Sequence, residues 1–214
     1  MIKAVLFDLD GTFADTAPDL GYAINRMREA RGLSQLPIAA IRPVASLGAR
    51  GLLNAGFSLT PEHPNYQAMH GEFLRLYEQN LCRDTRLFPG IFELIDAIDA
   101  RQFRWGIVTN KAERYARPLL ELLHVGKRAA CIIGGDTTGK IKPHPEPLLA
   151  ASRVLAIAPG ACVYVGDDRR DIEAGRAAGM RTVAVTYGYL NGSDPISWGA
   201  DAVIERPQDL LSYL

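Results

Sequence analysis

Short apolar runs alternate with longer amphipathic stretches along most of this chain, and this alternation restricts its fold more than any other feature. The runs are rich in Val and Ile and are apolar throughout, which is typical of strands covered on both faces. The predicted strands are Ala4–Leu9, Trp105–Thr109, Ala130–Gly134, Cys162–Gly166, Thr182–Thr186 and Ala202–Glu205. The helices predicted between them are Gly90–Arg101, Glu113–Leu123, Glu146–Leu155 and Asp171–Ala178. Strands that alternate with helices predict an α/β fold with a doubly wound parallel sheet.

One long stretch interrupts this alternation. Between about residues 16 and 83 the sequence predicts helices but no strand, and several prolines separate the helical patterns. The predicted helices are Asp19–Arg31, Ser46–Ala55 and Tyr66–Leu81. A stretch of roughly 65 residues is too long to be a loop inside a compact domain. We therefore expect a small helical cap domain of residues 16–83, inserted after the first strand of a core formed by residues 1–15 and 84–214.

Composition excludes several classes of protein. Lys and Arg number 24 and Asp and Glu number 24, so the net charge is zero and no overall positive field favours nucleic acid. The N-terminal apolar run meets Asp8 after a few residues, which indicates neither a signal peptide nor a membrane span. The three cysteines form no CxxC pattern and no disulfide framework. We expect a cytoplasmic protein that binds neither nucleic acid nor membranes.

Acidic, hydroxyl and cationic residues stand at the carboxyl ends of four predicted strands, the edge at which open parallel sheets bind ligands. Each residue alone has an ordinary explanation, such as a turn at Asp10, a charge at a helix start for Asp171, or a solvated loop position for Lys142. A suitable group at every strand end nevertheless indicates a site. The residues are Asp8, Asp10, Thr109, Asn110, Lys142, Asp167, Asp168 and Asp171.

Four segments that carry these residues resemble, in order and separation, the motifs of the haloacid dehalogenase-like phosphatases. The segments are Asp8-Leu9-Asp10-Gly11-Thr12, Val108-Thr109-Asn110, Lys142-Pro143 and Gly166-Asp167-Asp168-Arg169-Arg170-Asp171. The resemblance covers essentially the whole chain, and the helical insert is similar to that family's cap of the first type. It implies a Rossmann-like core and a Mg²⁺-dependent phosphomonoesterase that acts on a small phosphorylated metabolite. Phe13 and Ala14 depart from the family's more usual residues beside the site.

The resemblance also implies roles for individual residues. Asp8 is expected to be the nucleophile that forms an aspartyl-phosphate, and Asp10 the acid and base. Thr109, Asn110 and Lys142 complete the catalytic set, and Asp8, Asp167 and the Asp10 backbone carbonyl are expected to bind the metal. Asp171 is expected to orient Lys142 or waters on the metal. Asp168 either helps, like Asp171, to orient the residues that contact the substrate or metal, or is a charge at the start of a helix.

Physical chemistry supports this set independently. The repulsion between a carboxylate and a phosphate dianion is about 8 kcal/mol at 4 Å and an effective dielectric constant near 20. A carboxylate attacks phosphorus only if other groups offset that repulsion. Mg²⁺ offsets it while using one or two carboxylates as ligands, here Asp8 and Asp167. Lys142 adds positive charge, and Thr109 adds a hydroxyl donor.

Two substrates stay open within the family. Residues 142–148 and 187–189 are similar to bacterial phosphoglycolate phosphatases, which makes phosphoglycolate the first candidate. Residues 15–19, 48–50 and 198–201 are similar to N-acetylmuramic acid 6-phosphate phosphatases. Both substrates carry a carboxylate away from the phosphate. Arg50 is the candidate to bind this carboxylate, because a guanidinium forms two parallel hydrogen bonds with a carboxylate. The alternative for Arg50 is a solvated surface charge.

Other functions share part of this pattern. A phosphomutase of the same superfamily would share every motif, whereas a dehalogenase would not need Asp10. A receiver-type signalling module, which is phosphorylated on Asp, also gathers acids, a Thr and a Lys at strand ends. Receivers are about half this length and have no helical insert after the first strand, so the sequence favours the enzyme.

Overall fold

A six-stranded, entirely parallel sheet forms the centre of the computed structural model, which describes residues 1–214. The strand order is β5-β4-β1-β6-β7-β8. The strands are β1 (Ala4–Phe7), β4 (Arg104–Val108), β5 (Ile132–Ile133), β6 (Cys162–Gly166), β7 (Arg181–Val185) and β8 (Ala202–Ile204). The predicted doubly wound sheet is therefore confirmed, with β1 and β6 adjacent at the point where the order reverses.

Helices cover both faces of this sheet, and alternate residues of β1 pack on opposite sides. Ala4 and Leu6 belong to an apolar cluster with side chains of α7 (Glu146–Leu155) and α8 (Arg169–Ala177). Val5 and Phe7 belong to a larger cluster with α5 (Ile91–Ala100) and α6 (Glu113–Leu122). Burial on both faces explains why the strands appear in the sequence as continuous apolar runs.

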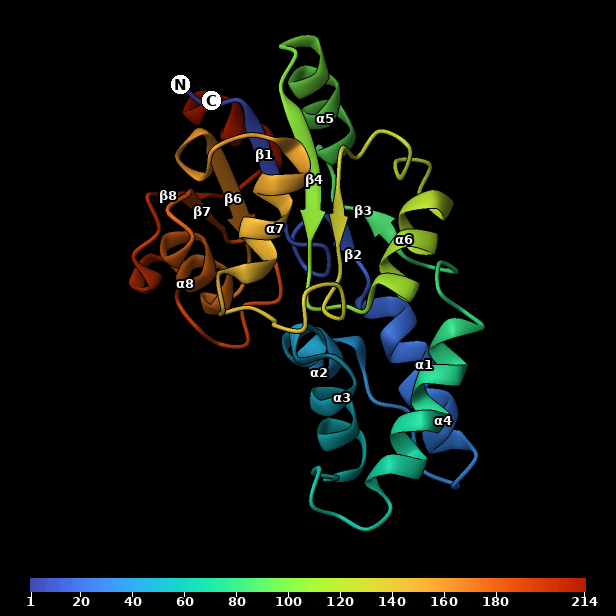
Figure 1. Cartoon of the computed structure of the whole chain (residues 1–214). Coiled ribbons are helices and arrows are strands. Elements are labelled where there is room, and N and C mark those ends of the chain that lie inside the picture. The colour runs from blue at the N-terminus through green and yellow to red at the C-terminus, as the bar shows by residue number, and fades with distance from the viewer.

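The remaining helices lie beyond the carboxyl edge of the sheet, at the end of the molecule opposite the two termini (Figure 1). They are α1 (Ala17–Glu29), α2 (Ile38–Ile41), α3 (Gly48–Phe57) and α4 (Tyr66–Glu78), with a 3₁₀ segment at Arg42–Leu47 between α2 and α3. Three further 3₁₀ segments belong to the sheet region: Pro159–Ala161, Pro195–Trp198 and Pro207–Tyr213. We call residues 16–83 the helical segment; its status as a separate cap domain stays a prediction.

A short antiparallel pair joins the helical segment to the sheet region. β2 (Ala14–Asp15) leads into the segment and pairs with β3 (Arg86–Leu87), which leads out of it. Asp19 at the start of α1 is fully buried, and its carboxylate accepts hydrogen bonds from the backbone N–H of Asp84 and from the N–H and hydroxyl of Thr85. These contacts hold the chain segment that enters the helical segment next to the one that leaves it. A continuous apolar cluster also links the helical segment to the α5–α6 face of the sheet.

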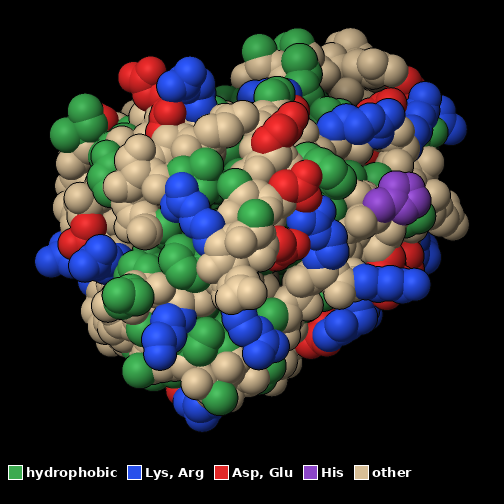
Figure 2. Space-filling view, turned by 90° about the horizontal axis from the view of Figure 1, so that it is seen from above, with side chains coloured by type: hydrophobic (Ala, Val, Ile, Leu, Met, Phe, Trp, Pro, Cys, Tyr) green, Lys and Arg blue, Asp and Glu red, His purple; other side chains and the backbone are tan.

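Charges of both signs share the surface. On the face seen in Figure 2, Lys and Arg side chains are interspersed with Asp and Glu and with hydrophobic groups, so no broad basic area gathers there. None of the helices combines the length and the apolar character that crossing a bilayer requires.

Leu6→Ala is expected to lower the free energy of unfolding by about 2–5 kcal/mol, because Leu6 is fully buried and its loss leaves a cavity under α7 and α8. Urea titration measures this change. Leu122→Ala is the matched control, since Leu122 on α6 is 54% exposed and its loss should cost less than about 0.5 kcal/mol. Equal losses from the two substitutions would contradict the packing described above.

Candidate active site

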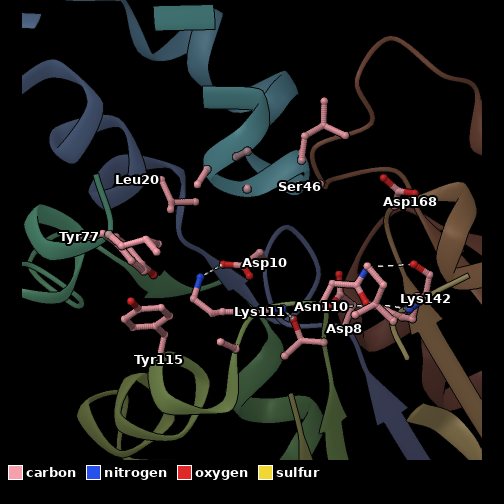
Figure 3. Close-up of a pocket in the computed structure, with 18 of the residues that line it drawn as sticks. Asp8, Asp10, Leu20, Ser46, Tyr77, Asn110, Lys111, Tyr115, Lys142 and Asp168 are labelled. Atoms are coloured by element: carbon pink, nitrogen blue, oxygen red, sulfur yellow. Dashed lines mark hydrogen bonds and ion pairs between the residues drawn. The ribbon is translucent and has the colours of Figure 1, made fainter. Parts of the chain in front are cut away.

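The carboxyl ends of three adjacent strands bring most of the sequence-predicted site residues together. Asp8 follows β1, Thr109 and Asn110 follow β4, and Asp167 follows β6. Lys142 enters from the loop between β5 and α7. A cavity of about 430 Å³ lies between these strand ends and the helical segment (Figure 3). The predicted residues that line it are Asp8, Asp10, Thr109, Asn110, Lys142, Asp168 and Asp171.

Lys142 is the central charge of the site. Its side chain is only 3% exposed, and its ammonium nitrogen lies 2.8 Å from Asp8 Oδ1 and 2.7 Å from Asp171 Oδ1. It also donates to Tyr164 Oη at 2.7 Å, and that hydroxyl donates onward to the Val108 carbonyl at 2.8 Å. Burial alone would lower the pKa of Lys142, but Asp171 and Asp8 outweigh it and hold the pKa above its ordinary value. Lys142 is therefore a fixed cation beside Asp8.

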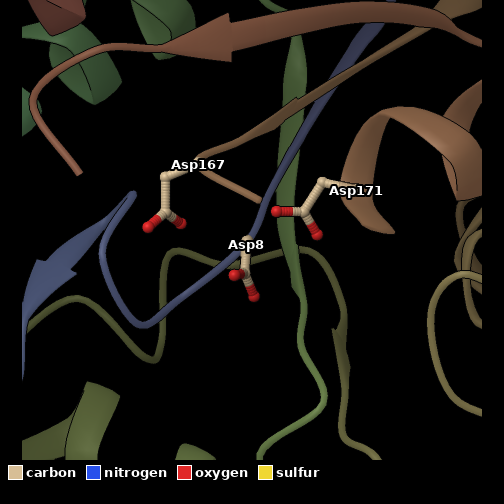
Figure 4. A group of neighbouring side chains, drawn as sticks. All are labelled: Asp8, Asp167 and Asp171. Carbon is tan, nitrogen blue, oxygen red and sulfur yellow. The ribbon is translucent and has the colours of Figure 1, made fainter. Parts of the chain in front are cut away.

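Three buried carboxylates surround a common space next to this cation. Asp8, Asp167 and Asp171 each place one oxygen within 4.8 Å of the others (Figure 4). Burial, with Asp171 as a further contribution, raises the pKa of Asp8 to about 7 despite the Lys142 ammonium. Burial and the charges of Asp8 and Asp171 raise the pKa of Asp167 well above its ordinary value. If all three carboxylates were ionised, they would carry more negative charge than the single lysine balances; burial and this excess together raise the pKa values of Asp8 and Asp167.

These carboxylates fit a divalent cation. Asp167 makes no ion pair with Lys or Arg and is held by the Thr12 hydroxyl at 2.7 Å and the Tyr189 N–H at 2.7 Å. No donor reaches Asp8 Oδ1 with hydrogen-bond geometry, although Lys142 lies beside it. Hard cations such as Mg²⁺ prefer this set of carboxylate oxygens. The side chains that gather here include Asp171, whereas the Asp10 carboxylate is not among them.

Gly11 permits the close approach of the first loop to this cluster. Its φ is +89°, and a Cβ atom at this position would overlap the Asp167 carboxylate and the Tyr189 ring. A residue with a side chain would therefore be strained and would displace Asp167.

Asp10 points away from the three-carboxylate cluster. Its Oδ1 accepts a hydrogen bond from the Thr16 hydroxyl at 2.5 Å and forms an ion pair with Lys111 Nζ at 2.7 Å. The Asp10 side chain is 14% exposed and borders the cavity. Asp10 therefore stands at the cavity wall, paired with Lys111 and not with the three clustered carboxylates.

Asn110 fixes the position of the lysine loop. Its side-chain amide donates to the Lys142 carbonyl at 3.0 Å, and its carbonyl oxygen accepts from the Lys142 N–H at 2.9 Å. Thr109 is 2% exposed, and its hydroxyl oxygen accepts from the Lys111 N–H at 3.1 Å. The contacts of Asn110 are thus with protein backbone, whereas the Thr109 hydroxyl accepts one hydrogen bond and donates none to a protein group.

Asp168 caps α8 and contacts the helical segment through Arg170. Its carboxylate accepts from the Arg170 N–H at 2.9 Å and forms an ion pair with the Arg170 guanidinium at 2.8 Å. Burial alone would raise the pKa of Asp168, but Arg170 outweighs burial and holds it below its ordinary value. Arg170 also donates to the Ser46 carbonyl at 3.0 Å. This geometry agrees with the reading of Asp168 as a charge at a helix start.

Arg50 lies apart from these residues. It is exposed on α3 and does not line the cavity, although Ser46, Leu47, Gly48 and Ala49 before it do. Its assignment to substrate binding stays a prediction without a contact to support it.

The sequence reasoning missed several groups around the cavity. Lys111 directly follows Thr109 and Asn110, and this place at a strand end is the signal by which it could have been identified. Ion pairing with Asp10 outweighs burial and raises the pKa of Lys111. Tyr77 of α4 also lines the cavity, and burial raises its pKa to about 12. Tyr77 and Tyr164 appear in the sequence only as members of apolar patterns, which gave no signal of a role in a site.

Comparison with known proteins agrees with this geometry. Residues 5–185 match the family model described as haloacid dehalogenase-like hydrolase. An N-acetylmuramic acid 6-phosphate phosphatase of Pseudomonas putida is 42% identical over 214 residues, which cover 100% of this chain and 96% of the relative. A phosphoglycolate phosphatase of Xanthomonas campestris pv. campestris is 45% identical over 209 residues, covering 97% and 94%. A crystal structure of a predicted phosphoglycolate phosphatase from Haemophilus somnus superposes with a TM-score of 0.88 at 27% identity, covering 99% of this chain and 97% of that one.

In metal-free buffer, Asp8→Asn is expected to gain stability relative to the wild type as the pH rises from about 4 to about 7. Burial holds the pKa of Asp8 at about 7 in the folded protein, against about 3.9 in an unfolded chain. The folded wild type therefore keeps a proton that the unfolded chain has released, and its stability falls as the pH rises through this window. The difference should change by up to about 1.4 kcal/mol per pH unit.

Urea unfolding of both proteins in EDTA, across this pH range, measures that difference. Saturating Mg²⁺ should remove most of it, because a cation favours the ionised carboxylate. A difference that is independent of pH in EDTA would show that Asp8 is not a destabilised buried acid.

Proposed function

The chain belongs to the haloacid dehalogenase-like hydrolases and is a phosphoric monoester hydrolase, and we propose that it uses Mg²⁺ and Asp8 to hydrolyse a small phosphorylated metabolite through an aspartyl-phosphate. The observation that carries this proposal is the buried group formed by Asp8, Asp167, Asp171 and Lys142 at the strand ends. It offers a carboxylate for attack and the positive charge that attack on a phosphate dianion requires.

Mg²⁺ would be held by the carboxylates of Asp8 and Asp167 and by the backbone carbonyl of Asp10. When bound, it supplies charge that offsets the repulsion between the phosphate and Asp8. Asp171 contacts Lys142 directly, so its proposed role is to fix the position of that ammonium.

In the first step, an Asp8 carboxylate oxygen bonds to phosphorus and the bond from phosphorus to the ester oxygen breaks. Lys142 and the Thr109 hydroxyl stabilise the charge on the phosphoryl oxygens. Protonated Asp10 gives its proton to the ester oxygen, which leaves as an alcohol. Asp8 then carries the phosphoryl group.

In the second step, the Asp10 carboxylate takes a proton from a water molecule. The water oxygen bonds to phosphorus as the bond to Asp8 breaks, so inorganic phosphate and free Asp8 result. The first step needs Asp10 beside the leaving ester oxygen and the second step needs it beside the attacking water, in agreement with its position at the edge of the cavity.

The substrate is proposed to be a phosphomonoester that also carries a carboxylate. Phosphoglycolate is the first candidate, since relatives named phosphoglycolate phosphatase are up to 45% identical. N-acetylmuramic acid 6-phosphate is the second candidate, and the size of the cavity favours it. The cavity volume of about 430 Å³, with apolar walls that include Leu20, Phe73 and Leu74, exceeds what phosphoglycolate fills.

The wild type is expected to release inorganic phosphate from at least one of these two esters with Mg²⁺, and EDTA should abolish the release. Asp8→Asn should reduce kcat to less than about 1% of the wild-type value, because an amide neither attacks phosphorus nor holds the metal well. A phosphate-release assay measures both. Activity that survives EDTA or the Asp8 substitution would overturn the proposal, and an isomerised ester without free phosphate would indicate a phosphomutase.

Asp10→Asn is expected to reduce kcat by about 10²–10⁴-fold, because it removes the proton carrier and keeps the backbone carbonyl. Titration calorimetry with Mg²⁺ should show nearly unchanged affinity. A collapse of Mg²⁺ binding in this variant would mean that the Asp10 side chain holds the metal site together and has been assigned the wrong role.

A further inference from the structure

One corner of the cavity holds polar groups that the proposed chemistry does not use. Lys111 follows β4 and its side chain is 8% exposed, while Tyr77 comes from α4 in the helical segment and is 2% exposed. The ammonium nitrogen of Lys111 lies 4.8 Å from the centre of the Tyr77 ring. Both residues line the cavity, together with Tyr115 of α6, whose ring packs edge-on against Tyr77. Residues distant in the sequence thus meet at this corner.

Tyr77 presents an unsatisfied hydroxyl there. Its oxygen is buried and makes no hydrogen bond of ordinary geometry, although the Lys111 ammonium lies close enough to act on its pKa. Buried polar groups are nearly always hydrogen-bonded, because leaving one unpaired costs roughly 1–3 kcal/mol. Because Tyr77 lines the cavity, a molecule bound there can supply the missing partner.

The position of this corner relative to Asp8 indicates which part of a substrate reaches it. Figure 3 shows Asp10 between Asp8 and Lys142 on one side and Lys111 and Tyr77 on the other. Lys111 contacts Asp10 directly at 2.7 Å. Because Asp10 protonates the ester oxygen in the proposed reaction, the leaving group lies on the Asp10 side of the phosphate, the side on which Lys111 also lies.

We propose that Lys111 and Tyr77 form a subsite that binds the carboxylate of the substrate's leaving group. This inference rests on the proposed function and deepens it. An ammonium and a hydroxyl are both donors, and together they match an anionic oxygen acceptor. The phosphate itself is bound by Lys142 and Thr109, so a second cation at the far side of Asp10 serves a second anionic group.

The competing explanation is that Lys111 only balances the charge of Asp10. That role accounts for the ion pair but not for the unpartnered Tyr77 hydroxyl on the neighbouring helix. The two explanations also predict different kinetics. A partner of Asp10 affects every ester equally, whereas a carboxylate subsite affects only esters that carry the carboxylate.

Two pairs of esters separate these explanations. Phosphoglycolate is compared with 2-hydroxyethyl phosphate, in which a hydroxymethyl group replaces the carboxylate. N-acetylmuramic acid 6-phosphate is compared with N-acetylglucosamine 6-phosphate, which lacks the lactyl group and its carboxylate. The quantity measured is the ratio of kcat/KM within each pair, called here the carboxylate preference, for wild type and variants with Mg²⁺ present.

Lys111→Met is expected to lower the carboxylate preference by about 10- to 150-fold, the range for loss of one hydrogen bond to a charged group. Tyr77→Phe should lower it by about 5-fold or more, and it keeps the ring packing against Phe73 and Tyr115. Tyr77→Phe therefore tests the subsite even if the Lys111→Met variant does not fold. Lys127→Met, which removes an exposed lysine outside the cavity, is the control for net charge and should leave the preference unchanged.

Equal losses of kcat/KM on both members of a pair would overturn the inference and make Lys111 a positioning residue for Asp10. A wild type without a carboxylate preference would overturn it too, while the proposed function would stand. Loss of the preference in Arg50→Met but not in Lys111→Met would place carboxylate binding at Arg50 and overturn the inference. Absence of Mg²⁺-dependent phosphate release from all four esters would overturn the proposed function and this inference together.

Discussion

Three carboxylates and a single ammonium are buried together where β1 and β6 end, and most of the structure serves to hold them there. Lys142 contacts Asp8 and Asp171 at 2.8 and 2.7 Å, while Asp167 is without a cation. Such a cluster is electrostatically costly, and only a rigid frame keeps carboxylates so close together. The parallel strands supply that frame, because both faces of the sheet are packed against helices. The same excess of carboxylates over cations that destabilises the metal-free site fits it to a divalent cation.

Much of the fold was predictable because its signals are local. Apolar runs mark strands covered on both faces, so a sheet of parallel strands followed from their alternation with helices, whereas the order of the strands was not predicted. The β2–β3 pair was missed, since four residues, Ala14–Asp15 and Arg86–Leu87, carry no periodic pattern. The 3₁₀ segment Arg42–Leu47 was also missed, because such turns depend on packing more than on propensity.

The candidate site was predictable where chemistry follows directly from position at a strand end. Asp8, Thr109 and Asp167 were predicted in this way; Asp8 lies beside Asp167 and lines the same cavity as Thr109. Contacts between distant segments were not predictable: nothing local indicates that Asn110 pairs with the backbone of Lys142. The same limit applies to Tyr77, which looks in the sequence like any other apolar-face residue of a helix. A side chain acquires such roles only through the partner that folding brings to it.

The most direct test of this account is to identify the atom that takes up the phosphoryl group. A ³²P-labelled ester that the enzyme hydrolyses is mixed with it and Mg²⁺, the reaction is quenched with acid within one turnover, and the labelled peptide is mapped. The account predicts transient label on the peptide that contains Asp8, labile to hydroxylamine as an acyl phosphate is, and absent with EDTA. Phosphate release without any labelled protein, or label on a residue other than Asp8, would contradict it.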